Sequence, residues 1–349
     1  MICQKNINIA FLGCGGIANA HLNELQKIPG AVIKACWNRP EEFHLAESFK
    51  EKSGAAYCTK DYLKIAEDPE VDAVYICTMQ NDRARLFESC AAAGKAIFME
   101  KPLALRREDF QDIARIYRQY PVIFQSGYKL RFNSLMEYIA GQEFKPEAVY
   151  CHVADGAWAD NHPATDNNIG GGHILSQGVY AAETLRLLAK SVPTAVNAML
   201  NYSDSNGKIH GTLTANYRFQ NNVIGSIMIT DAGVAPAPVS KFYAEASGQQ
   251  QSMIILDRFT GLVSIDAAGN RREAHFQEDG FYRQSVAFLD NVRNGNNTGC
   301  SFLDGIYPSM MIHLAMEAAI AQRTLSIDLN TWLQFSSSMW EKSPMFVEV

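Results

Sequence analysis

Short apolar runs alternate with helix-like stretches through the first 126 residues, and this alternation restricts the fold more than any other feature of the chain. The expected strands are Ile7–Leu12, Val32–Trp37, Val71–Cys77, Ala96–Met99 and Val122–Ser126. The expected helices are Ile17–Ile28, Pro40–Lys52, Asp82–Ala93 and Arg107–Gln119. Strands that alternate with helices in this way predict an α/β domain with a mostly parallel, doubly wound sheet.

The pattern changes near residue 125, where candidate strands begin to follow one another directly. These strands are Ala148–Val153, Ala195–Tyr202, Leu213–Phe219, Val223–Thr230, Lys241–Ala246, Ser252–Asp257, Leu262–Ile265 and Arg272–Phe276. Residues 267–270 (Ala-Ala-Gly-Asn) are typical of a hairpin turn. Helices are expected at Gly178–Ala189, Tyr282–Asn294 and Gly305–Arg323. We therefore predict two domains, residues 1–125 with the parallel sheet and residues 126–349 with an α+β fold built on a large, mostly antiparallel open sheet.

Composition excludes several classes of function. The chain has 349 residues, enough for two domains, and a formal net charge of −6 disfavours a nucleic-acid-binding surface. No apolar run is long enough to cross a bilayer. The eight cysteines lack paired or zinc-like spacing and are expected to be buried thiols of a reducing compartment. Residues 5–20 resemble a secretory signal, but Asn8 and three glycines interrupt the apolar stretch, so a cytoplasmic location is expected.

A glycine-rich segment at residues 13–18 (Gly-Cys-Gly-Gly-Ile-Ala) fits the dinucleotide-binding pattern G-x-G-x-x-[GA] between an expected strand and helix. Gly13 would permit the tight turn, Gly15 would let a pyrophosphate approach the backbone, and Ala18 would let helix and strand pack closely. The N–H groups at the helix start would bind phosphate. The expected cofactor-binding residues of this segment are Gly13, Gly15, Gly16, Ile17 and Ala18. A glycine-rich turn in another α/β domain is the alternative.

The residues after the second expected strand bear on the choice of dinucleotide. An NAD-binding domain usually has an acidic residue there, about 20 positions after the fingerprint, that binds the ribose hydroxyls. This chain has Asn38 followed by Arg39. Asparagine does not repel a 2′-phosphate, and arginine pairs with one. We therefore predict NADP as the cofactor, with NAD as the alternative, in which Asn38 only caps the next helix and Arg39 is solvated.

Polar residues also follow two later strands. The apolar run that follows Lys95 ends at Glu100-Lys101-Pro102. Thr78 and Gln80 follow the expected strand that ends at Cys77. Ligands bind at the carboxyl ends of strands in open α/β sheets. We therefore add four residues to the expected cofactor-binding set, namely Thr78, Gln80, Glu100 and Lys101. The alternative for Lys101 is a structural lysine that pairs with Glu100.

The fingerprint, residues 71–78 and Glu100-Lys101-Pro102 occur here in the order seen in the Gfo/Idh/MocA family of oxidoreductases, which the chain resembles over nearly its whole length. Further similar segments are Arg131-Phe132-Asn133, Gly170-Gly171-Gly172 through Tyr180, and Gly305–Leu329. The resemblance implies a Rossmann domain joined to a C-terminal open sheet. It also implies hydride transfer between a nicotinamide cofactor and a sugar, polyol or related hydroxy compound.

The resemblance places Lys101 near the nicotinamide and the substrate hydroxyl, where an ammonium stabilises negative charge on oxygen. Many family members carry an Asp and a His after the triple glycine, but Ser176 and Tyr180 occupy those positions here. The chain thus resembles the glucose–fructose oxidoreductase and dimeric dihydrodiol dehydrogenase type, which uses tyrosine as proton donor. Lys101 and Tyr180 are the expected catalytic pair. Because Ser176 cannot carry charge, a non-catalytic dinucleotide-binding sensor or regulatory protein on the same fold stays as the alternative.

On a helix, Ser176 and Tyr180 lie one turn apart on one face and would point into the same cleft. A polar loop with one aromatic residue, from Ala154 to His162, is a further candidate for sugar binding. The expected substrate-binding residues are Lys101, Arg131, Trp158, Asn161, Ser176 and Tyr180. No metal site is expected, because the histidines lack metal-ligand spacing. A broad sheet face needs cover, so a homodimer or homotetramer is expected.

Overall fold

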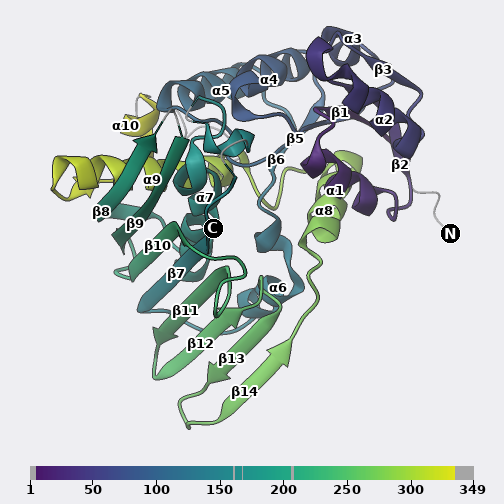
Figure 1. Cartoon of the computed structure of the whole chain (residues 1–349). Helices are drawn as coiled ribbons and strands as arrows, with labels where there is room; N and C mark the ends of the chain where they lie inside the picture. The colour runs from purple at the N-terminus through teal and green to yellow at the C-terminus, as the bar shows by residue number, and fades with distance from the viewer. Residues whose placement is uncertain (1–4, 160–161, 167, 206–207, 335–349) are drawn as a thin grey trace. The chain divides into compact units, whose positions relative to one another are not determined.

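The computed structural model describes residues 5–334, except 160–161, 167 and 206–207, and Figure 1 shows its elements. The chain forms two compact units. The first extends to Gly127 and includes Phe281–Gly305, and the second consists of Tyr128–Gly280 and the residues from Ile306 onward. Phe281–Gly305 thus lies beyond the predicted boundary at residue 125 yet packs with the first unit, because Phe288 and Leu289 are buried in its core.

The first unit holds a parallel sheet, which confirms the predicted doubly wound α/β fold. Its described strands are β1 (Ile7–Leu12), β2 (Ala31–Trp37), β3 (Tyr57–Thr59), β4 (Ala73–Ile76), β5 (Ala96–Met99) and β6 (Phe124–Ser126), in the order β3-β2-β1-β4-β5-β6. Its helices are α1 (Gly16–Leu25), α2 (Phe43–Ser53), α3 (Leu63–Ala66), α4 (Arg83–Ala92), α5 (Arg107–Gln119) and α8 (Gly280–Asn294), with one-turn helices η1 (Pro40–Glu42) and η2 (Gln80–Asp82). The sequence pattern missed β3 and α3, which are too short to show periodicity.

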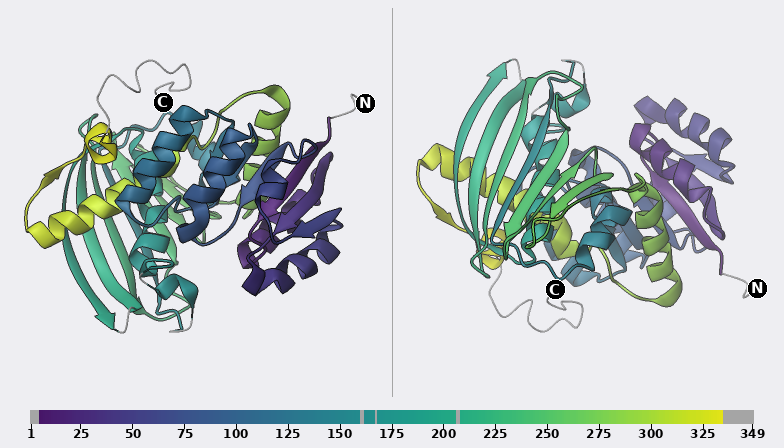
Figure 2. Two further views of the ribbon diagram at one scale, coloured as in Figure 1. Left: turned by 90° about the horizontal axis from the view of Figure 1, so that it is seen from above. Right: turned by 90° about the horizontal axis from the view of Figure 1, so that it is seen from below.

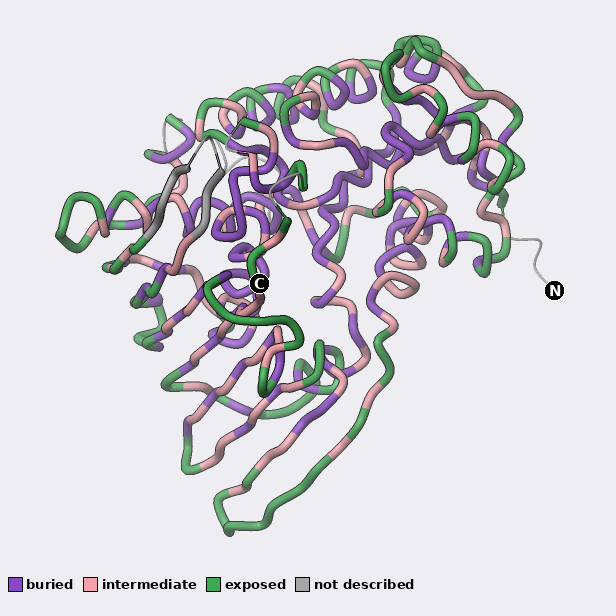
Figure 3. Tube along the Cα trace, in the orientation of Figure 1, coloured by how far each residue is buried: buried purple, intermediate pink, exposed green. Residues whose placement is uncertain are grey.

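The core of this unit lies on both faces of the parallel sheet, and Figure 3 shows its central strands β1, β4, β5 and β6 almost entirely buried. On one face, β1 side chains pack with residues of α1, α2 and α8. Tyr75 of β4 and Phe98 of β5 stack there with ring centroids 4.5 Å apart. A second aromatic group joins Tyr117 of α5 to Phe302, with centroids 4.3 Å apart. Burial on both faces explains why these strands read as continuous apolar runs.

The second unit is built on the large sheet that the sequence predicts, and the sheet is mostly antiparallel. Its described strands are β7 (Ala148–Gly156), β8 (Pro193–Ser205), β9 (Lys208–Phe219), β10 (Ile224–Gly233), β11 (Phe242–Gly248), β12 (Gln251–Leu256), β13 (Gly261–Ile265), β14 (Arg271–His275) and β15 (Leu325–Ser326), in the order β14-β13-β12-β11-β7-β10-β9-β8-β15. Figure 2 shows these strands in one curved layer. Strands β7 and β10 pair in parallel. The predicted hairpin turn joins β13 and β14, with Gly269 at φ +83°.

Helix α7 (Gly172–Ala189) packs on this sheet. The other described helical elements of the second unit are α6 (Ser134–Ala140), α9 (Phe302–Ala321, which begins in the first unit), α10 (Leu329–Leu333), η3 (Lys129–Phe132) and η4 (Pro163–Thr165). A Cβ on Gly178 would lie 2.5 Å from Ile229 Cδ1, so the missing side chain lets α7 approach β10 closely. No helix in the described part of the chain is both long and apolar enough to cross a membrane.

Candidate cofactor-binding and active site

The fingerprint loop joins β1 to α1, and Gly13 sits where it meets the end of β4. Gly13 has φ +95°, and its N–H donates to Trp37 O at 2.9 Å. A Cβ at this position would lie 2.9 Å from Thr78 N. Only glycine combines this φ with such a close approach. The glycine therefore lets the carboxyl ends of three neighbouring strands, β2, β1 and β4, converge.

The N-terminus of α1 is open. Gly15 is the N-cap residue, no side chain caps the helix there, and its first turn contains no acidic residue. A Cβ built on Gly15 or Gly16 would meet no described atom within 4 Å. Ala18 is fully buried, as close helix–strand packing requires. The uncapped N–H groups and the space above Gly15 form a cradle that a pyrophosphate fits.

Two buried polar atoms beside this loop also fit a dinucleotide. Thr78 is 6% exposed and Gln80 is 6% exposed, and both follow β4. Thr78 Oγ1 and Gln80 Oε1 have no hydrogen-bond partner among the described residues. Buried polar atoms without partners cost free energy unless a ligand or water satisfies them. Their position at a strand end next to the glycine loop makes a bound cofactor the natural partner.

The end of β2 carries a cluster of charges. Asn38 is buried, and its Oδ1 accepts from Arg39 N at 2.9 Å. Arg39 Nε lies 2.8 Å from Asp82 Oδ2, and Arg85 Nη2 lies 3.0 Å from Asp82 Oδ1. One carboxylate therefore faces two guanidinium groups, which leaves a net positive charge. The sequence pointed to Arg39, but only the structure places Asp82 and Arg85 beside it.

Glu100 of the Glu-Lys-Pro segment is a buried carboxylate with a histidine partner. Its Oε1 lies 2.7 Å from His21 Nε2 of α1. Its Oε2 accepts from Lys101 N at 3.2 Å. Burial pushes the pKa of Glu100 upward, but the hydrogen bond and charge of His21, with the charges of Lys101 and Arg83, hold that pKa below its ordinary value. Glu100 therefore stays ionised and fixes the backbone at Lys101.

Sequence reasoning missed His21 and Arg83. His21 is a polar residue on the otherwise apolar buried face of α1, and that contrast was the available signal. Arg83 is 3% exposed and bonds to backbone carbonyls of Thr78, Glu100 and Pro102. Backbone partners from distant segments leave no mark in the sequence.

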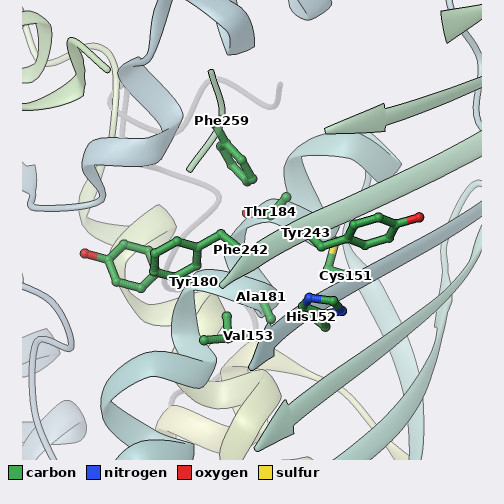
Figure 4. A pocket seen from close by; sticks show the side chains of 9 residues that line it. All are labelled: Cys151, His152, Val153, Tyr180, Ala181, Thr184, Phe242, Tyr243 and Phe259. Atoms are coloured by element: carbon green, nitrogen blue, oxygen red, sulfur yellow. The ribbon is translucent and has the colours of Figure 1, made fainter. Parts of the chain in front are cut away.

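In the second unit, α7 carries Ser176 and Tyr180 one turn apart, as the helical pattern predicts. Ser176 is 8% exposed and Tyr180 is 9% exposed. The Tyr180 ring packs edge-on against Phe242, with centroids 5.2 Å apart, and against Tyr128 at 6.4 Å. Figure 4 shows Tyr180 among the side chains that line a narrow hollow without room for a water molecule, with its hydroxyl pointing away from the other side chains.

Arg131, expected at the substrate, makes an ion pair with Glu183 of α7. Its Nε and Nη2 both lie 2.8 Å from Glu183 Oε1 on α7. Arg186 Nη2 lies 3.7 Å from the other oxygen of Glu183. The Arg131 side chain is 13% exposed and that of Glu183 is 3% exposed. This pair ties η3 to the helix that carries Tyr180, and the sequence pattern did not single out Glu183.

In the polar loop after β7, the ring of Trp158 lies close to two histidine rings. Trp158 lies 4.8 Å from His162 and 5.2 Å from His173, measured between ring centroids. His162 Nδ1 accepts from Ala164 N at 3.1 Å and so caps η4. Asn161, the other expected substrate-binding residue of this loop, lies outside the described residues.

The described cysteines, at positions 14, 36, 58, 77, 90, 151 and 300, are free thiols, and all except Cys58 are buried. A hydrogen bond with Cys36, together with burial, raises the pKa of Cys14, so the thiol of the fingerprint loop stays protonated. Within the described ranges, no three His, Cys, Asp or Glu residues lie close enough to hold a metal ion.

Comparison with known proteins identifies both units. Residues 7–128 match the family described as an oxidoreductase family with an NAD-binding Rossmann fold, and residues 140–252 match the GFO/IDH/MocA C-terminal domain. Myo-inositol 2-dehydrogenase of Thermotoga maritima is 25% identical over 339 residues, which cover 92% of this chain and 99% of that protein. The 1,5-anhydro-D-fructose reductase of Ensifer adhaerens is 26% identical over 300 residues, 78% of this chain and 87% of that protein.

Among solved structures, a levoglucosan dehydrogenase in complex with NADH and L-sorbose has the same fold. It superposes with a TM-score of 0.82 at 19% identity and covers 93% of this chain and 99% of its own. The two family models together match most of the chain. The chain therefore belongs to the Gfo/Idh/MocA family of oxidoreductases, enzymes with an NAD-binding Rossmann domain.

Proposed function

We propose that this protein transfers hydride between a nicotinamide dinucleotide and a sugar, polyol or related hydroxy compound. One observation carries the proposal. The open glycine loop lies beside the unpartnered atoms Thr78 Oγ1 and Gln80 Oε1 at the carboxyl edge of the sheet. The same edge carries Lys101 at the end of β5. The proposed dinucleotide site and the candidate catalytic cation would thus share one edge, where ligands of open α/β sheets bind.

Within this proposal, each cofactor-binding residue has a stated task. The N–H groups of α1 at Gly16, Ile17 and Ala18 would bind the pyrophosphate, with Gly13 and Gly15 leaving it room. Asn38 and Arg39 would meet the adenosine ribose. Thr78 and Gln80 would donate or accept hydrogen bonds along the cofactor, and Glu100 would hold Lys101 in place.

The dinucleotide that we propose is NADP, with NAD as the alternative. Arg39 and Arg85 share the single carboxylate of Asp82, so these three side chains together carry one positive charge. A 2′-phosphate would be attracted to that charge, and guanidinium groups bind phosphate through paired hydrogen bonds. The buried amide of Asn38 adds no negative charge that would repel it.

The proposed chemistry uses two side chains of this protein. The nicotinamide supplies the hydride acceptor or donor when it is bound. Lys101 would stabilise the negative charge that develops on the substrate oxygen. Tyr180 would hold the proton at its phenolic oxygen and exchange it with that oxygen as general acid or base. Ser176 would orient a substrate hydroxyl.

The substrate class is proposed from the relatives and from the second unit. The relatives named above act on inositol, anhydrofructose and levoglucosan, as their names state. The ring group of Trp158 offers an aromatic surface beside polar loop residues, and Asn161 and Arg131 stay candidates for substrate hydroxyls. We further propose a cytoplasmic enzyme that assembles as a homodimer or homotetramer through the broad sheet.

The decisive experiment is fluorescence titration with NADPH and NADH, followed by a screen of carbonyl compounds and polyols with the preferred dinucleotide. Saturable binding and turnover of a sugar or polyol support the proposal. Absence of binding by either dinucleotide would overturn it. Binding without turnover across the panel would instead favour a dinucleotide-binding sensor, the second candidate, which rests on Ser176 in place of the usual aspartate.

A further inference from the structure

Arg83, the first residue of α4, is a buried guanidinium held by backbone carbonyls. The residue is 3% exposed. Its Nε and Nη2 donate to Thr78 O, at 3.0 Å and 2.6 Å. Its Nη1 donates to Glu100 O and to Pro102 O. The three carbonyls belong to the segments that leave β4 and β5, so one side chain links the carboxyl ends of two neighbouring strands.

The placement of these carbonyls gives Arg83 its significance. Glu100 and Pro102 flank Lys101, so Arg83 holds the backbone on both sides of the proposed catalytic lysine. Thr78 belongs to the segment proposed to contact the cofactor. A guanidinium is planar and presents its donors in a fixed fork, which restrains all three acceptors together. Burying such a charge costs several kcal/mol unless its donors find partners. The carbonyl partners of Arg83 are therefore required for its burial, whereas a surface arginine can bond to water.

The restraint by Arg83 complements the one by His21. His21 holds the Glu100 carboxylate at 2.7 Å, and that carboxylate accepts from Lys101 N. Arg83 holds the carbonyls of the same short segment. The side chain of Glu100 is thus held by α1, and the main chain of the Glu100–Pro102 segment is held by α4.

We propose that Arg83 is a positioning residue for hydride transfer, which sets the backbone from which Lys101 reaches the reacting oxygen. The inference rests on the proposed role of Lys101. Its consequence is specific: both the charge and the forked geometry of Arg83 are required, because a single ammonium cannot bridge three carbonyls of two segments.

The test uses the full-length protein with Arg83→Ala, Arg83→Lys and the surface control Arg115→Ala. Arg115 lies on α5, and its side chain is 57% exposed. In both Arg83 variants kcat should fall about 100-fold, the loss that a misplaced catalytic group causes. Millimolar ethylguanidine should restore kcat in Arg83→Ala, whereas N-ethylurea and propylamine should not. A residue needed only for folding would lower the melting temperature without selective rescue by a guanidinium.

A second readout needs no turnover. Reductive methylation with ¹³C-formaldehyde labels the lysines, and the Lys101→Arg variant identifies the Lys101 resonance. That resonance should move in Arg83→Ala and return with ethylguanidine, while the other lysine resonances stay in place. It distinguishes this inference from the proposed function, because it can succeed in a protein that turns over nothing in the screen. An unchanged Lys101 resonance in both Arg83 variants, or kcat within about twofold of the wild type, would overturn the inference. If Arg83→Ala does not fold, Arg83→Lys alone decides by the same two measurements.

Discussion

His21 Nε2 of the fingerprint helix lies 2.7 Å from Glu100 Oε1 of the Glu-Lys-Pro segment, inside the first unit. His21 is fully buried and Glu100 is 4% exposed. The imidazole also packs edge-on against Tyr75, Phe98 and Phe281. The pair therefore connects the element proposed to bind the pyrophosphate with the segment proposed to perform the chemistry. Neither motif reveals this connection when read alone.

Replacing His21 should lower the free energy of unfolding. In His21→Leu the Glu100 carboxylate stays buried without its partner, and loss of one member of a buried pair typically costs about 3–5 kcal/mol. We expect a decrease of that order in the free energy of unfolding measured in urea. The double variant His21→Leu/Glu100→Leu should recover part of the loss, because no lone charge remains. A double variant less stable than His21→Leu would contradict this account.

Glu100 should make stability depend on pH in a defined direction. Its folded pKa is held below the ordinary value of 4.5, so its ionised form stabilises the fold above that pH. The contribution is lost as pH falls through the folded pKa. The difference in unfolding free energy between wild type and Glu100→Gln should therefore be largest near neutral pH and shrink below pH 4.5. A difference that grows on acidification would reverse the assigned sign.

Replacement by alanine should affect stability at one fingerprint glycine and dinucleotide affinity at another. Gly13→Ala places a Cβ 2.9 Å from Thr78 N at φ +95°, and should destabilise the fold by about 1–3 kcal/mol. Gly15→Ala meets no described atom within 4 Å, so its melting temperature should match the wild type. Its dinucleotide affinity should nevertheless fall about tenfold or more, because the Cβ occupies the space proposed for the pyrophosphate. Calorimetry and fluorescence titration separate the two effects, and Gly15→Ala with wild-type affinity would exclude that position for the phosphates.

Arg39 and Asp82 should control the choice of dinucleotide. Arg39→Ala should weaken NADPH binding about tenfold while changing NADH binding less, because it removes a cation proposed for the 2′-phosphate. Asp82→Asn should shift the preference toward NADPH, since it removes the carboxylate that now pairs with Arg39 at 2.8 Å. Titrations with both dinucleotides measure the ratio, with Arg115→Ala as the control. An unchanged ratio in both variants would place the 2′ position elsewhere.

Tyr180→Phe removes only the phenolic hydroxyl and so tests its role by itself. The ring contacts with Phe242 and Tyr128 are kept, so the protein should fold and bind the dinucleotide as before. Turnover should fall about 100-fold, within the usual contribution of a general acid or base. Steady-state kinetics with the preferred substrate give the comparison. Full activity in this variant would mean that another group handles the proton.

The sequence determined the architecture because the signals that specify it are local. Strand–helix alternation predicted the parallel sheet, the run of strands after residue 125 predicted the antiparallel one, and the helical face predicted that Ser176 and Tyr180 share one side of α7. The fingerprint marked Gly13 as the turn residue, which its positive φ confirms. Each of these features depends on neighbours within a few residues along the chain.

The tertiary structure decided which side chains surround those motifs. Arg131 pairs with Glu183, and Arg39 shares Asp82 with Arg85, and none of these partners could be read from the sequence. His21 reaches Glu100 across 79 positions of the chain. Such partners are chosen by packing in three dimensions, since a buried charge must find a complementary group wherever the fold brings one near. The sequence alone therefore named the motifs, and only the folded chain showed what holds them.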